Sequence, residues 1–123
     1  MNRYLFVMTG AAAGGLARYV IGSFIQERAN LRFPIGTFVV NVTGCFLIGL
    51  LMTWFSDRHD PNPNLRLLLV TGMLGGYTTF SSFAWESFVA VEERAFWTGM
   101  INLVSSVAAG YCAVVLGAWL ARK

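Results

Sequence analysis

Four long apolar runs are separated by short polar segments along this chain. The runs cover residues 4–25, 35–56, 67–91 and 95–121. A helix needs about 20 residues to cross a hydrocarbon core about 30 Å thick, so each run is long enough to span a bilayer. The pattern predicts an all-α membrane protein whose four transmembrane helices form a single domain over residues 1–123.

The third run differs from the others between Thr71 and Phe83. This stretch reads TGMLGGYTTFSSF, with adjacent glycines followed by adjacent threonines. Glycine destabilises a helix interior by about 1 kcal/mol relative to alanine, and β-branched threonine is also a weaker helix former. At membrane depth a broken helix is tolerated only where protein or a polar cavity satisfies the freed backbone groups. We therefore predict that the third transmembrane helix is broken and that the break lines a site.

Composition supports a membrane protein. Hydrophobic residues make up 56% of the chain and charged residues 12%, with a mean hydropathy of +0.60. Soluble domains carry about 25% charged residues. The first run is too long for the apolar region of a signal peptide, contains Arg18 and lacks a cleavage site.

The remaining composition disfavours several other classes of protein. The net charge of +3 is not clustered, so no nucleic-acid partner is expected. His59 lies in a polar loop, residues 57–64, and is expected to be solvated and not to bind metal. Cys45 and Cys112 lie inside predicted helices and are expected to be small, buried and reduced. Without a nucleophile–base set, metal cluster or nucleotide loop, an enzyme is the least favoured class.

The loop charges give little preference for one membrane orientation. One side holds five basic residues and the other holds three, namely Arg3, Arg58, Arg66, Arg122 and Lys123 against Arg28, Arg32 and Arg94. This is a weak bias under the positive-inside rule. We hypothesise that the chain inserts in both orientations, which would allow an antiparallel homodimer.

Small residues predict close helix packing in the first two runs. Gly10, Gly14 and Gly15 lie among alanines in the first run, and Gly44 and Gly49 lie in the second. Small residues let helix backbones approach closely in lipid. A packing role is the simplest interpretation of all five.

Two polar side chains in the first two runs each allow two interpretations. Arg18 either forms an electropositive vestibule that attracts anions or anchors its helix by reaching to the interface. Asn41 either offers its amide donors to an anion or links two helices. For Asn41 alone, the link is favoured.

The third run also carries a pair of aromatic rings. Phe80 and Phe83, three residues apart, fall on one helical face, and their positively polarised edges would support a small anion. The alternative is simple packing. Four nearby hydroxyl side chains either line a pore or bond back to their own helix, namely Thr78, Thr79, Ser81 and Ser82. Glu86 is expected near the far interface, where it would engage a basic residue or gate the pore mouth.

A polar stripe runs along the fourth predicted helix. Asn102, Ser106 and Gly110 are spaced four residues apart and share a face. They form either a polar track or an ordinary seam between helices.

Taken together, these motifs resemble those of the Fluc family, small bacterial and archaeal fluoride channels. The resemblance covers nearly the whole chain and rests on its four spans, the early glycine-rich helix with Arg18, and two motifs. These are Gly36-Thr37-x-x-Val40-Asn41-x-x-Gly44 and Gly72-x-x-Gly75-Gly76-x-Thr78-Thr79-Phe80-Ser81-Ser82-Phe83. Ser82 departs from the threonine common in the family, but it keeps the hydroxyl.

The resemblance implies passive export of cytoplasmic fluoride across the inner membrane by an antiparallel, dual-topology homodimer with two pores. Asn41 would donate to fluoride, and Phe80 and Phe83 would form an aromatic box. Asn102 and Ser106 would also line the pore, at positions that vary more among relatives. The family also holds a central sodium ion, here through the backbone carbonyls of Gly75 and Thr78.

The main rival is a small multidrug exporter, which is also four-spanned and often dimeric. Such transporters typically need an acidic residue in the first span. The first run here contains Arg18 and no carboxylate, which favours the channel.

Overall fold

The computed structural model describes residues 2–57 and 62–123, and its regular structure in these ranges is helical. The predicted solvation of His59 concerns a residue outside the described ranges. In chain order the helices are α1 (Arg3–Ala29), α2 (Ile35–Ser56), α3 (Pro63–Arg66), the π-helix η1 (Leu67–Leu74), α4 (Gly75–Tyr77), α5 (Phe80–Glu92) and α6 (Phe96–Ala121).

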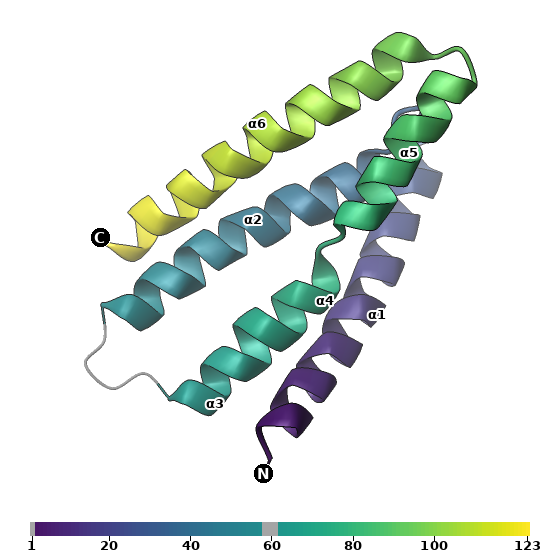
Figure 1. Ribbon diagram of the computed structural model, residues 1–123. Coiled ribbons are helices and arrows are strands. Elements are labelled where there is room, and N and C mark those ends of the chain that lie inside the picture. Colours follow the sequence, from purple (N-terminus) through teal and green to yellow (C-terminus); the bar gives the residue numbers. More distant parts are fainter. Residues whose placement is uncertain (1, 58–61) are drawn as a thin grey trace.

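Four helical spans are long and apolar enough to cross a membrane: Arg3–Ala29, Ile35–Ser56, Pro63–Glu92 and Phe96–Ala121. The third is assembled from α3, η1, α4 and α5. The prediction of an all-helical, multi-pass membrane chain is therefore confirmed. Figure 1 shows that the start of α1, the end of α2, the start of α3 and the end of α6 lie toward one end of the molecule, as four crossings require.

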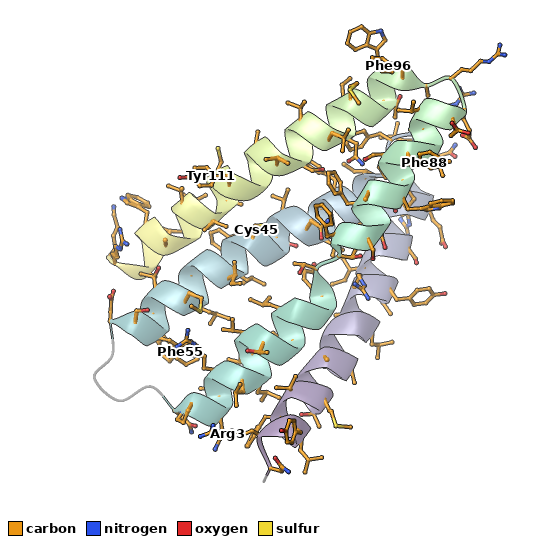
Figure 2. All side chains as sticks on the ribbon, viewed as in Figure 1. Arg3, Cys45, Phe55, Phe88, Phe96 and Tyr111 are labelled. Carbon is orange, nitrogen blue, oxygen red and sulfur yellow. The ribbon has the colours of Figure 1, made fainter. Side chains whose placement is uncertain are left out.

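The helices pack in two main pairs. α2 lies along α6, and α1 lies along η1 and α4, while α5 returns to pack on α6 (Figure 1). The buried apolar core is small, with Val40, Leu74 and Tyr77 at its centre. Many apolar side chains point outward instead, such as Tyr111, which is 71% exposed (Figure 2). Such a surface suits contact with lipid or with another membrane helix.

Glycines create the closest helix contacts. A Cβ on Gly10 or Gly14 would overlap the backbone of Leu68 or Met73 in η1, and one on Gly49 would overlap the backbone of Val114 in α6. These positions thus pack as predicted. Gly15 does not, because nothing lies within 4 Å of its Cβ position.

A similar close contact joins α2 to the third span. A Cβ on Gly44 would overlap the side chain of Thr78, which confirms the packing role predicted for this glycine. The expectation of buried cysteines is wrong for Cys112, which is exposed on the outer surface of α6, and Cys45 is only partly buried. Both thiols are free.

The third span breaks at the threonines. Thr78 and Thr79 adopt extended conformations, with φ/ψ of −79°/156° and −147°/117°. Gly75, by contrast, is helical at −62°/−36°. The glycines therefore do not form the break themselves. Gly76 instead allows close approach to α1, because a Cβ there would come within 3.0 Å of the Cα of Ala11.

Candidate anion-permeation site at the helix break

Asn41 supplies the hydrogen bonds that the broken helix lacks at Thr79. The Asn41 Nδ2 donates to the Thr79 carbonyl at 2.9 Å, and the Thr79 N–H donates to the Asn41 Oδ1 at 2.8 Å. A primary amide carries two N–H donors, and the bond to Thr79 uses one of them. Asn41 is therefore a link between helices, and within residues 2–57 and 62–123 its second N–H is available to another acceptor.

Arg18 satisfies the neighbouring carbonyl in the break. Its Nη1 donates to the Thr78 carbonyl at 3.0 Å, and the guanidinium is partly buried. Because α1 continues to Ala29, Arg18 lies well inside the helix and not at its end. This geometry does not match an interfacial anchor. It places a positive charge beside the break.

A cavity of about 780 Å³ opens between α1, α2 and α5 and reaches the break. Arg18, Thr79 and Ser82 contribute to its lining. The lining also carries Glu27, Arg32, Glu86 and Glu93. The cavity is therefore not uniformly electropositive, and the positive charge at the break belongs to Arg18.

Glu86 bonds to a hydroxyl and not to a base. The Thr37 Oγ1 donates to the Glu86 Oε1 at 2.7 Å, while the buried Oε2 has no hydrogen-bond partner among the described residues. Among the described residues, the prediction that Glu86 engages a basic residue is therefore wrong. Thr37 and Glu86 both line the cavity, and no role was predicted for Thr37 from the sequence beyond its place in the motif at residues 36–44.

The two phenylalanines lie side by side but in different surroundings. The ring centroids of Phe80 and Phe83 are 5.6 Å apart and their planes are tilted by 56°. Phe83 is 7% exposed, whereas Phe80 is 79% exposed. Phe83 thus belongs to the packed bundle of this chain, and Phe80 projects from it.

The CrcB-like protein, Camphor Resistance (CrcB) family matches residues 5–118 of the chain. This chain belongs to the CrcB family. Several curated relatives carry the name "Fluoride-specific ion channel FluC", and three of them illustrate the similarity. The protein from Solibacter usitatus is 55% identical over 98% of this chain and 99% of its own length. The protein from Acidobacterium capsulatum is 48% identical over 94% and 92%, and that from Chloroflexus aurantiacus 43% over 99% and 97%.

In this CrcB-family chain the hydroxyls near the break bond mainly to one another. The Thr79 Oγ1 accepts from the Ser82 N–H at 3.2 Å and so caps α5. The same hydroxyl donates to the Ser82 Oγ at 3.1 Å and lies 3.4 Å from the Ser81 Oγ. Ser82 lines the cavity, while Ser81 is exposed.

The polar stripe on α6 joins α6 to α5. Asn102 is 2% exposed and donates through Nδ2 to the Ser87 Oγ at 2.9 Å. Ser87 donates in turn to the Phe83 carbonyl at 2.8 Å, and the Ser106 Oγ donates to the Asn102 Oδ1 at 3.1 Å. A continuous set of bonds thus runs from the stripe to the backbone of the buried aromatic residue. The spacing of Phe83 and Ser87, one turn apart, was the available signal for the missed Ser87.

A further link between the CrcB-family motifs was not predicted. The Tyr77 hydroxyl lies 2.9 Å from the Thr43 Oγ1. Thr43 thus joins Asn41 and Gly44 in holding the segment before and through the break. The motif at residues 36–44 on α2 therefore packs against the motif at residues 72–83 and bonds to it on both sides of Thr78.

Proposed function

We propose that this chain is a subunit of a fluoride-selective channel that exports cytoplasmic fluoride passively and protects the cell from its toxicity. Its 55% identity to a fluoride-specific channel over 98% of the chain carries the proposal. Hydrogen fluoride enters a cell as a neutral weak acid and ionises in a less acidic cytoplasm. A channel for the anion relieves that accumulation without ATP. The inner membrane is the corresponding location.

The geometry supports a route for a small anion past the break. Fluoride must exchange tightly held water for other donors, strongly enough to enter and weakly enough to leave. The remaining N–H of Asn41 and the edges of Phe80 and Phe83 are donors of this moderate kind. Arg18 lies at the break and would attract an anion to the cavity. Because it is a single positive charge, it would not bind the anion tightly. Ser81 and Ser82 are the adjacent hydroxyls, and Asn102 and Ser106 continue the polar route in this proposal.

We propose that the functional unit is an antiparallel homodimer in a lipid bilayer. In one chain Phe80 is 79% exposed, so only the Phe83 ring of the aromatic pair is buried. A second copy packed on this face would enclose Phe80 and complete a narrow path. The weak bias of basic residues between the two ends is compatible with both orientations.

Sodium is proposed as a structural ion at the centre of such a dimer. Backbone carbonyls are hard oxygen ligands suited to an alkali cation, and a helix break directs carbonyls away from the helix ladder. Gly75 is exposed in the single chain and Thr78 is extended, which fits a role for their carbonyls at a shared interface. The Thr78 carbonyl also accepts from Arg18, so an ion there would share this oxygen with the guanidinium.

Fluoride efflux from liposomes that contain the purified protein tests the function. Valinomycin carries potassium, chloride is the control anion, and sodium is present. Fast, ionophore-dependent fluoride release with little chloride release is expected. A properly assembled dimer that releases no fluoride would overturn the proposal.

A further inference from the structure

Gln26 uses both ends of its side-chain amide at the start of α2. Its Nε2 donates to the carbonyls of Leu31 and Phe33, at 2.9 and 3.2 Å. Its Oε1 accepts from the Gly36 N–H at 3.1 Å. One partly buried side chain on α1 thus holds the connection after its own helix and the first turn of the next.

The first turn of α2 depends on this outside acceptor. The opening N–H groups of a helix have no partner within the helix, and a side chain before it usually caps one of them. α2 is preceded by Pro34, which makes no side-chain cap bond. Gln26 supplies the missing acceptor from α1.

The same turn is pressed closely against α1. A Cβ on Gly36 would overlap the Gly22 carbonyl and would lie 3.3 Å from the Gln26 Cβ. Steric contact alone keeps the backbones from moving closer, but it does not keep them from separating. The bond from Gly36 to Gln26 opposes that separation.

The residue after Gly36 makes the contact inside the cavity. Thr37 donates to Glu86 at 2.7 Å, and one helical turn further on Asn41 pairs with Thr79. Gln26, Thr37 and Glu86 all line the same cavity. Gln26 therefore holds the Gly36 end of the first turn of α2, and the bonds of Thr37 and Asn41 hold the residues that follow.

We propose that Gln26 is a positioning residue for permeation, because it fixes the start of α2 and thereby holds Thr37 against Glu86. This inference rests on the proposed channel function. The hydrogen bonds of Gln26 go to Leu31, Phe33 and Gly36, not to the break. Its effect on the ion passes through Gly36 and Thr37.

Single-channel fluoride current in planar bilayers separates positioning from folding, since it reports only channels that have assembled. Gln26→Met keeps the length of the side chain and removes its hydrogen bonds. We expect its current to fall about tenfold, the factor that corresponds to losing, among these three bonds, the one that holds the Gly36 N–H. Gln26→Glu keeps an acceptor for the Gly36 N–H at a helix start that favours negative charge. Its current is expected to exceed that of Gln26→Met clearly.

Asn30→Gly is the matched control at the same end of α1. Asn30 caps the helix with φ of 48°, a conformation that glycine adopts readily. This variant leaves the three bonds of Gln26 in place and is expected to keep the parental current. An equal current in assembled Gln26→Met channels, or a current in Gln26→Glu as low as in Gln26→Met, would overturn the inference.

A double variant tests whether Gln26 acts through Thr37. Thr37→Val removes the hydroxyl that donates to Glu86. If Gln26 acts through this contact, adding Gln26→Met to Thr37→Val lowers the current little further. Multiplied losses would contradict the proposed route. A parent protein with no fluoride current would instead refute the channel function itself.

Discussion

The side chain of Asn41 pairs with both backbone groups of Thr79, although the two residues are 38 positions apart in the chain. A side-chain amide presents a donor and an acceptor in the same arrangement as a peptide group. Asn41 therefore substitutes for a neighbouring strand or helix turn at the point where the third span has neither. The pairing places an amide with a remaining N–H at the break.

Asn41→Ala is expected to reduce both stability and fluoride flux. Each buried backbone group left without a partner costs about 1–3 kcal/mol, and both groups of Thr79 lose their partner. Thermal unfolding in detergent should show a lower midpoint, and liposomes should release fluoride more slowly. Thr9→Val is a control on the exposed face of α1, where the hydroxyl bonds only to its own helix. Full stability with lost flux would show that the pairing contributes nothing to the fold.

Phe80→Ile and Phe83→Ile are expected to reduce fluoride flux sharply while the proposed dimer stays assembled. Phe83 is 7% exposed and packs within its own chain, whereas Phe80 is 79% exposed there and would be covered only by the proposed second copy. Reshaping the buried position is expected to cost about 1–2 kcal/mol. Flux assays with size-exclusion chromatography and thermal unfolding measure all three properties. Intact flux in both variants would remove the rings from the mechanism.

Arg18→Met should weaken fluoride flux most strongly at low ionic strength. The substitution removes the charge beside the break and leaves the Thr78 carbonyl without its donor. Salt screens the attraction between a charged wall and an ion over about 10 Å at 0.1 M. The difference from the parent protein should therefore shrink as an impermeant salt is added. A deficit independent of salt would assign Arg18 a purely structural role.

Adjacent glycines in α1 provide a matched test of helix packing. A Cβ on Gly14 would overlap the Met73 backbone, whereas nothing lies within 4 Å of the corresponding position at Gly15. Gly14→Ala is expected to separate α1 from η1 and lower the yield of folded protein. Gly15→Ala should retain or raise thermal stability, since alanine favours a helix by about 1 kcal/mol over glycine. Equal effects of the two substitutions would contradict the packing seen here.

Removal of sodium is expected to lower the thermal stability of the assembled protein. The carbonyls of Gly75 and Thr78 are the proposed ligands, so the ion would bind the native state and not the unfolded chain. Unfolding midpoints measured in sodium and in a bulky organic cation at equal ionic strength test this. A midpoint that does not respond to sodium concentration would argue against a bound structural ion.

The sequence by itself determined the features that depend on short stretches of chain. Four apolar runs were sufficient to predict four membrane-spanning helices, because hydropathy acts on each segment separately. The irregular composition between Thr71 and Phe83 likewise predicted a break in the third span. The spacing of Phe80 and Phe83 was enough to place their rings side by side, since i and i+3 share a helical face.

The tertiary structure decided which residues form the break and which side chains bond to it. The break falls on Thr78 and Thr79 and not on the glycines, because Gly76 packs against α1 while Asn41 satisfies the extended backbone. For Arg18, the structure shows a bond to a carbonyl 60 positions away, which the sequence does not reveal. Such a bond depends on how whole helices lie against one another. No local pattern of hydrophobic and polar residues contains that information.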